Sequence, residues 1–449
     1  MLPTRLAVWL LGLGLVPLVG GVIVSFLLGP DGEALAWLGR FAVLAYDLAV
    51  LLLLFVDALL ARRAQQKLRV RRERPSRLSV GVENEIVLMI ENLSHSRRSV
   101  VVRDHPPAPF PAMPGLLSVA LPAHGWARLR YRLVPTDRGN FSFGDLDVRC
   151  RGPLGLAWVD RTTEAAEAVQ VFPNLLEVRR YEALVRATLV QVGGYHIRRL
   201  PGAGREFSHF RDYTVDDDYR HVSWKATARR GKPITSVFES EHSQDVIFCL
   251  DVGRMMAARV GGLSKLDHAI NAVLMLTHVS QRFQDNVGLL VFSHAVHLWL
   301  PPAKGRAQHA RFLQALYTVK PELVYVNYKE AFQHLVARHP KRALVMVFTD
   351  LLDTVVSSEY RDAVQLLRRF HLPLTLAVAD VPLGELAART PESISDLYDI
   401  QVARGLLHDR AELLRSLERA GVLVVDTVPE RVTVDAVNRY LSLKTGAKI

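Results

Sequence analysis

The sequence predicts a membrane-anchored protein of several domains, namely a two-helix transmembrane hairpin, a β-sandwich and a doubly wound α/β domain. Two long apolar runs fill the first 60 residues, a period-two pattern follows, and short apolar runs then alternate with helical patterns. At 449 residues the chain is long enough for several cores. The expected domains are a hairpin over 1–62, a basic juxtamembrane linker over 63–77, a sandwich over 78–175, a linking segment over 176–244 and the α/β domain over 245–449.

The N-terminal segment predicts two transmembrane helices, at about residues 6–29 and 41–60. No charged residue lies between Leu6 and Pro30, and this run exceeds the ~20 residues that a helix needs to cross a membrane. A cleaved signal peptide fits poorly, because a second apolar run follows at once. That run contains Asp47, expected to face the partner helix or an oligomer interface, and Asp57, expected to reach the membrane surface beside Arg62.

Most of the net charge of +11 comes from a group of basic residues that directly follows the second apolar run. Positive charge there marks the cytosolic flank of a membrane helix and binds anionic headgroups of the bilayer. We therefore expect a multi-pass protein of a bacterial cytoplasmic membrane with its soluble domains in the cytosol. No motif for nucleic-acid binding is present, so no nucleic-acid partner is expected. The basic residues are Arg62, Arg63, Lys67, Arg69, Arg71, Arg72, Arg74 and Arg77.

Residues 78–175 predict an immunoglobulin-like β-sandwich. In 128–133 leucine and tyrosine alternate with arginine, which is typical of a half-buried antiparallel strand. In 141–148 the apolar parity changes, and a β-bulge at Gly144 would restore one inward face. The two cysteines, Cys150 and Cys249, fall in different predicted domains, so we expect free thiols rather than a disulfide.

From residue 245 the pattern predicts a parallel sheet covered by helices on both faces. Strands are expected over 246–251, 287–292, 296–300, 343–348, 372–379 and 422–426. Helices are expected over 265–283, 307–316, 329–337, 358–370, 404–420 and 431–443. Asp251 and Asp350 fall at the carboxyl ends of two strands, where such sheets bind ligands.

The segment Gly202–Lys232 is dense in arginine, aspartate and aromatic residues. We expect Arg211 or Arg220 to pair with Asp217 or Asp218, partly desolvated between two domains, with Trp224 packed beneath. The segment closely resembles the family called domain of unknown function 58. The matching residues, taken as the interaction surface, are Gly202, Gly204, Glu206, Phe207, Arg211, Tyr213, Asp217, Asp218, Arg220, Trp224, Lys225 and Arg229.

The last domain resembles a von Willebrand factor A domain, a Rossmann-like fold whose metal site reads Asp-x-Ser-x-Ser. This chain has Asp251, Gly253 and Met255 at those positions, and glycine and methionine are not ligands for a hard cation. The site at Asp251 and Asp350 is therefore degenerate, and no cofactor is expected. Bound Mg²⁺ is one alternative, and hydrogen bonding of Asp251 to a helix end or a nearby loop is the other.

The resemblance implies a non-enzymatic, membrane-tethered adaptor that partners a MoxR-type AAA ATPase in protein assembly, maturation or envelope maintenance. One alternative is a metal-assisted hydrolase using Glu206 and the triple Asp216–Asp218 with His209 or His221. Another is an envelope adhesion or binding protein. No Gly-x-Ser-x-Gly elbow, P-loop or His-Glu-x-x-His motif is present. The client, the ATPase and the oligomeric state are left open.

Overall fold

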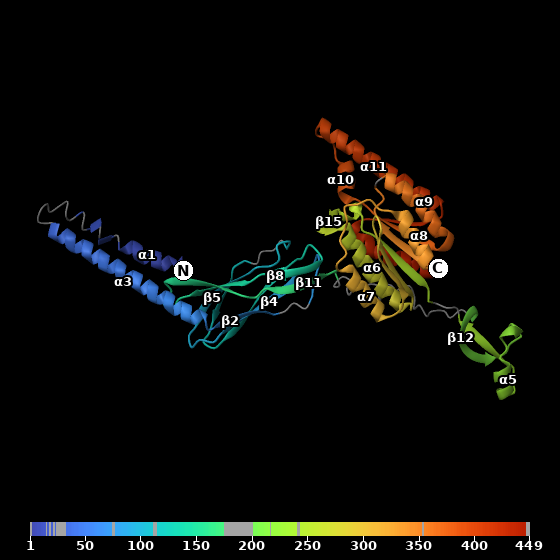
Figure 1. Cartoon of the computed structure of the whole chain (residues 1–449), viewed down its shortest axis with the longest axis horizontal. Helices are drawn as coiled ribbons and strands as arrows, with labels where there is room; N and C mark the ends of the chain where they lie inside the picture. Colours follow the sequence, from blue (N-terminus) through green and yellow to red (C-terminus); the bar gives the residue numbers. More distant parts are fainter. Residues whose placement is uncertain are drawn as a thin grey trace. The chain divides into compact units, whose positions relative to one another are not determined.

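The computed structural model describes residues 2–14, 16–17, 19–20, 23, 33–73, 77–110, 115–174, 201–215, 217–239, 243–352 and 354–445 (Figure 1). The chain divides into two compact units, Met1–Phe172 and Pro173–Ile449. The first unit holds the apolar helices and the β-sandwich, and the second holds the α/β domain.

The first unit begins with strand β1 (Leu2–Pro3), helix α1 (Arg5–Leu13) and the long helix α3 (Glu33–Gln65). Within the described residues, one helical stretch, Trp37–Gln65, is long and apolar enough to cross a membrane. The other predicted span, 6–29, contains α1 and lies partly outside the described residues.

Helix α1 packs against α3, and the Tyr46 hydroxyl donates a hydrogen bond to the Leu10 carbonyl at 3.0 Å. A Cβ atom placed on Gly14 would lie 2.5 Å from Oδ1 of Asp47. Asp47 therefore faces the end of the neighbouring helix, in agreement with the expectation from the sequence.

Ten further strands form the β-sandwich, in three sheets of order β1-β10-β9-β5-β6, β3-β11-β8 and β2-β4-β7. Alternate residues of β4 are buried, including Ile86, Leu88 and Ile90, so the period-two pattern marks the core face. The bounds are β2 (Leu68–Glu73), β3 (Leu78–Ser79), β4 (Asn84–Asn92), β5 (Arg98–Asp104), β6 (Leu117–Leu121), β7 (Trp126–Leu133), β8 (Gly139–Phe143), β9 (Leu146–Arg151), β10 (Ala157–Thr163) and β11 (Glu167–Phe172).

The prediction of a basic linker over 63–77 is corrected, because most of these residues belong to a helix or a strand. Helix α3 continues to Gln65, and β2 then pairs antiparallel with β4. Leu68 and Val70 point into the core, whereas Arg69 and Arg71 are exposed. The alternation typical of a strand was hidden by the high charge of the exposed positions.

Arg72, expected at the membrane surface, lies instead inside the sandwich. Its guanidinium forms an ion pair with Asp104 at 2.5 Å and stacks over the Phe143 ring at 4.3 Å. It also donates to the carbonyls of Gly144 and Ala165. The Tyr131 hydroxyl donates to Asp104 at 2.7 Å. The buried charge pair is thus well hydrogen-bonded, which offsets the cost of removing it from water.

The bulge predicted at Gly144 is also corrected. Strand β8 pairs with β11, while β9 pairs with β5 and β10, so the chain changes sheet between them. The Gly144 amide donates to the His105 carbonyl at this corner. The change of parity in the sequence therefore marks a change of sheet rather than an extra residue within one strand.

Asp57 of α3 joins the long helix to the sandwich, rather than reaching the membrane surface as expected. It is fully buried, and its carboxylate accepts hydrogen bonds from the backbone amides of Leu154, Leu156 and Ala157 at 2.7–2.8 Å. A Cβ atom on Gly152 would lie 2.3 Å from this carboxylate, so the contact requires glycine there.

The second unit contains a six-stranded sheet of order β18-β17-β14-β19-β20-β21. All neighbours pair in parallel except β18, which pairs antiparallel with β17, so the predicted all-parallel sheet is corrected at this edge. The connection 293–295 is far too short for a crossover between parallel strands. The bounds are β14 (Asp245–Asp251), β17 (Asn286–Phe292), β18 (Val296–Ala303), β19 (Leu344–Thr349), β20 (Leu372–Val378) and β21 (Leu423–Thr427).

Helices cover both faces of this sheet, as predicted (Figure 1). On β14, Phe248 and Leu250 pack toward α6, α7 and α12, whereas Ile247 and Cys249 pack toward α8, α9 and α11. The bounds are α6 (Lys265–Arg282), α7 (Arg306–Leu316), α8 (Tyr328–Arg338), α9 (Thr354–Phe370), α10 (Val381–Ala388), α11 (Ile394–Arg419) and α12 (Val432–Thr445). Helix α10 was not predicted, and α11 begins ten residues before its predicted start at residue 404.

A short antiparallel ribbon precedes the sheet in the chain. It consists of β12 (Pro201–Asp212) and β13 (Ile234–Glu239), with the small helix α5 (Trp224–Arg230) between them. We call residues 209–237 the signature ribbon. Two minor strands, β15 (Arg259–Val260) and β16 (Leu263–Ser264), lead into α6.

Candidate functional site

The carboxyl end of β14 carries a buried aspartate whose oxygens are filled by protein donors. Oδ1 of Asp251 accepts from the Gly253 amide at 2.7 Å. Oδ2 accepts from the Thr349 hydroxyl at 2.6 Å and from the Tyr328 hydroxyl at 3.1 Å. Burial raises the pKa of Asp251 to about 6. Of the roles considered for Asp251, hydrogen bonding to the nearby loop is the one observed.

The second predicted carboxylate, Asp350, is bound by a lysine. Nζ of Lys265, fully buried at the start of α6, lies 2.7 Å from Oδ2 of Asp350 and 2.7 Å from Oδ2 of Asp380. Burial raises the pKa of Asp350 against the opposing effect of the ammonium. For Asp380 burial is the largest single effect and acts to raise the pKa, but the hydrogen bond and charge of Lys265, the Leu383 amide and the charge of Arg410 together lower it.

These residues do not fit Mg²⁺. The Lys265 ammonium already supplies the positive charge to Asp350 and Asp380, and the Asp251 carboxylate is saturated by hydroxyl and amide donors. Gly253 and Met255 bring no side-chain oxygen, whereas Mg²⁺ requires oxygen ligands in near-octahedral geometry. The strand ends of this domain thus form a buried polar network in which a lysine occupies the cationic role.

In the signature ribbon, one of the expected ion pairs forms. Arg211 pairs with Asp217, and Asp217 also accepts from the backbone amide and the hydroxyl of Thr214, both at 2.9 Å. The hydrogen bond from the Thr214 backbone, together with Arg211, lowers the pKa of Asp217. Asp218 caps a 3₁₀ turn by accepting from the Arg220 amide at 3.0 Å, and the Tyr213 hydroxyl donates to the Asp217 carbonyl.

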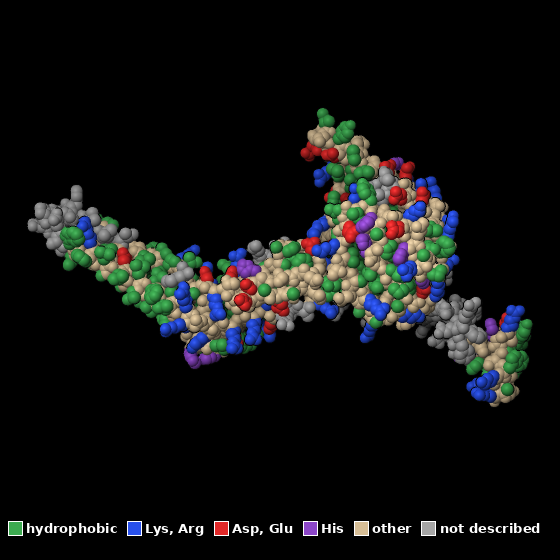
Figure 2. All heavy atoms as spheres, in the orientation of Figure 1, with side chains coloured by type: hydrophobic (Ala, Val, Ile, Leu, Met, Phe, Trp, Pro, Cys, Tyr) green, Lys and Arg blue, Asp and Glu red, His purple; other side chains and the backbone are tan. Residues whose placement is uncertain are grey.

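Trp224 does not pack beneath this network, which corrects the prediction. It opens α5 and is 74% exposed, and Tyr219 and Val215, earlier in the same ribbon, are 70% and 95% exposed. Among the described side chains of the signature ribbon, Ile234 and Thr235 are the buried ones. A ribbon this small has no core that would cover its aromatic side chains. Figure 2 shows hydrophobic and basic side chains side by side on it.

Basic side chains accompany the aromatic ones. Arg220, Lys225 and Arg229 are all exposed. Of Gly202, Gly204, Glu206 and Phe207 the structure describes only the backbone, within β12, and Asp216 lies outside the described residues. The candidate hydrolase group of Glu206 and Asp216–Asp218 lies partly outside the described side chains, and Asp217 and Asp218 make separate local contacts.

Several residues of the strand-end network were not singled out from the sequence. Asp380 follows the predicted strand 372–379, so the rule that ligands lie beyond strand ends would have found it. The same rule points to Thr349, which follows the predicted strand 343–348. Lys265 and Tyr328 carry no such signal, because a lysine or tyrosine at the start of a helix is ordinarily solvent-exposed. A further group, His294, His297 and Glu322, was also missed.

Comparison with protein families gives a match within the second unit. Residues 209–398 match the model of the family described as protein of unknown function DUF58. The DUF58 match begins within the signature ribbon and includes Asp251, Lys265, Asp350 and Asp380. The predicted family resemblance is therefore confirmed over this range.

The curated relatives are uncharacterized mycobacterial proteins. Rv1480 of Mycobacterium tuberculosis and Mb1516 of Mycobacterium bovis are each 21% identical over 270 residues, covering 57% of this chain and 84% of the relative. Among solved structures, the conserved hypothetical protein BatB from Bacteroides thetaiotaomicron aligns with 45% of this chain and all of its own, at 15% identity and a TM-score of 0.29. The CARDB domain of PF1109 from Pyrococcus furiosus aligns with 23% of this chain and 91% of its own, at 17% identity and a TM-score of 0.18.

Proposed function

We propose that this protein is a non-enzymatic, membrane-tethered adaptor that docks a cytosolic partner protein through the signature ribbon. The proposal is carried by the exposure of Trp224, Tyr219, Val215 and Arg220, all within residues 215–224 of the signature ribbon. Tryptophan, tyrosine and arginine are the residues that contribute most binding energy at protein interfaces. Exposed apolar side chains rimmed by charge are typical of interaction sites.

The partner we infer is a MoxR-type AAA ATPase, with a role in protein assembly, maturation or envelope maintenance. This part rests on the family resemblance. The α/β domain is taken as von Willebrand factor A-like, with its metal role replaced by the Lys265 network.

The anchor is proposed to be a two-helix hairpin in the bacterial cytoplasmic membrane, with α3 as its second span. Arg62 and Arg63 lie exposed at the end of α3, and Lys67, Arg69 and Arg71 follow on the exposed side of the chain. A positive cluster at this end favours a cytosolic location and contact with anionic headgroups. Asp57 would then hold the sandwich close to the inner surface of the membrane.

A pull-down from detergent-solubilised membranes tests the docking surface. The full-length chain is expected to retain the MoxR-type ATPase of its own organism in a nucleotide-dependent manner. Trp224→Ala and Tyr219→Ala each remove an exposed aromatic anchor, and we expect at least about a tenfold loss of retained ATPase, the effect of losing a hot-spot side chain.

The matched control is Trp126→Ala, because Trp126 is 60% exposed on the sandwich and lies outside the signature ribbon. It should retain the ATPase fully. Equal retention by all four proteins would show that the ribbon is not the docking surface. If even the unaltered chain retains no ATPase with any nucleotide, the inferred partner is wrong.

A further inference from the structure

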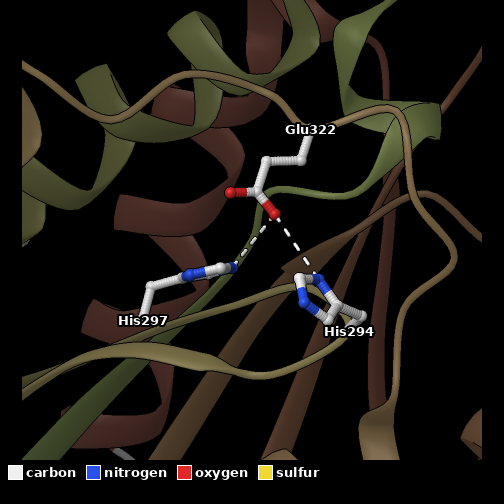
Figure 3. A group of neighbouring side chains, drawn as sticks. All are labelled: His294, His297 and Glu322. Atoms are coloured by element: carbon white, nitrogen blue, oxygen red, sulfur yellow. Dashed lines mark ion pairs between the residues drawn. The ribbon is translucent and has the colours of Figure 1, made fainter.

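A second cluster of functional groups lies one strand away from the Asp251 network. His294 lies in the short turn between β17 and β18, His297 is the second residue of β18, and Glu322 comes from the segment between α7 and α8 (Figure 3). Nε2 of His297 lies 3.2 Å from Oε2 of Glu322, and Nδ1 of His294 lies 3.7 Å from the same oxygen. All three ligand atoms lie within 4.8 Å of one another.

We propose that His294, His297 and Glu322 form a Zn²⁺ site. In a tetrahedral zinc site with ligands at 2.0–2.1 Å, neighbouring ligand atoms are about 3.3 Å apart. The two distances to Oε2 of Glu322, 3.2 and 3.7 Å, lie close to this value. The two histidine nitrogens lie within 4.8 Å of each other, so side-chain rotations that bring them closer would place all three atoms around one ion.

The loops that carry these ligands are already held together by the backbone. The Glu322 amide donates to the Val252 carbonyl at 2.7 Å, and the Val252 amide donates to the Phe292 carbonyl at 2.9 Å. The Asn327 amide donates to the Ser293 carbonyl at 2.9 Å. The ligand segments are thus fixed to the end of β14 and to each other, which reduces the ordering cost of binding an ion.

The hydroxyl of the fully buried Ser293 holds the three proposed ligand atoms around one point. It lies 2.7 Å from Oε2 of Glu322, 2.6 Å from Nε2 of His297 and 3.1 Å from Nδ1 of His294. A bound ion would replace these hydrogen bonds, because Ser293 contacts the same atoms that would coordinate it.

The chemistry of the cluster favours zinc over the hard cations. Two imidazoles and one carboxylate suit Zn²⁺, whereas Mg²⁺ and Ca²⁺ prefer sites made of oxygen. Three protein ligands leave one position of a tetrahedral ion for solvent. The side chains of His294 and Glu322 are 61% and 40% exposed, so an ion can enter from solution.

Titration of the full-length, detergent-solubilised chain with Zn²⁺ in competition with a chromogenic chelator tests the site. We expect one Zn²⁺ bound per chain at this cluster, with Mg²⁺ unable to compete. His294→Ala, His297→Ala and Glu322→Gln should each weaken Zn²⁺ binding by about 10–100-fold or more, since even second-shell changes have effects of this size. Zn²⁺ should also raise the Tm of the unaltered chain but not that of His297→Ala.

Two controls separate this site from other histidines. His408 lies 3.6 Å from Glu412 on α11, and no third ligand joins this exposed pair among the residues that the structure describes, so His408→Ala should bind Zn²⁺ as the unaltered chain does. His95 and His124 approach to 2.7 Å on the sandwich, so His95→Ala tests a two-histidine site there. The proposal is overturned if the three cluster variants bind Zn²⁺ like the unaltered chain, or if only His95→Ala reduces binding. Melting curves without metal confirm that each variant is folded, and the result does not depend on whether the ATPase binds.

Discussion

At the residue scale, two basic side chains show how far a local reading of charge can mislead. Arg72 lies in a run of arginines, and Lys265 opens an amphipathic helix, so both would ordinarily be exposed. Both are buried, and each neutralises carboxylates from distant parts of the chain, Asp104 for Arg72 and Asp350 with Asp380 for Lys265. In each case the basic group forms a buried ion pair inside the protein and does not lie at the surface.

Arg72→Ala should strongly destabilise the first unit, because it leaves the Asp104 carboxylate buried without its partner. Breaking a buried ion pair on one side costs about 3–5 kcal/mol. Arg71→Ala on the same strand removes an exposed arginine and should change the unfolding free energy by less than about 0.5 kcal/mol. Chemical denaturation of both variants measures the difference. Similar midpoints for the two would contradict the buried role of Arg72.

At the scale of elements, the decisive contact joins α3 to the sandwich. The Asp57 carboxylate of α3 accepts three hydrogen bonds from backbone amides. Two of these amides lie in the turn before β10, and the third belongs to Ala157, the first residue of β10. Leu54, Ala58 and Ala61 of α3 pack with β10 around this contact. The apolar helix and the sandwich therefore form one structural unit rather than an anchor joined by a free linker.

Asp57→Ala should weaken this junction, because a buried amide without an acceptor costs about 1–3 kcal/mol. We expect a lower Tm and faster proteolysis near residues 62–67. Gly152→Ala should have a similar effect, since its Cβ would displace the Asp57 carboxylate. Asp47→Ala is the control, because Asp47 faces α1 rather than the sandwich. If Asp47→Ala and Asp57→Ala melt alike, the amide contact is not what holds the junction.

At the scale of the whole molecule, the proposed arrangement has both ends of the chain and both soluble domains in the cytosol. A reporter fused after Ile449 should therefore be active only if it is a cytosolic type, and a reporter inserted at residues 31–32 should be active only if it is a periplasmic type. The physical reason is the positive cluster after α3, which resists translocation. A periplasmic reporter active after Ile449 would reverse the orientation and exclude contact with a cytosolic ATPase.

Patterns with a short period were enough to predict most elements. Strand 246–251 and helix 265–283 are observed within one residue of their predicted bounds, because burial on a sheet or helix repeats every few residues. The same reasoning missed β2, where exposed arginines concealed a period of two, and could not tell a bulge from a change of sheet at Gly144.

The sequence by itself determined the apolar helix, the alternation of the sandwich strands, the α/β order and the strand-end position of Asp251 and Asp350. Only the tertiary structure decided the partners of the buried and clustered polar groups. Lys265 pairs with Asp350, Arg72 with Asp104 and His297 with Glu322, and Asp57 accepts hydrogen bonds from three backbone amides. Burial of a side chain repeats with the local geometry of its own element, and so it leaves a periodic trace. The partner of a buried charged group comes from a distant segment that the fold brings close. The position of that partner in the sequence therefore follows no periodic pattern.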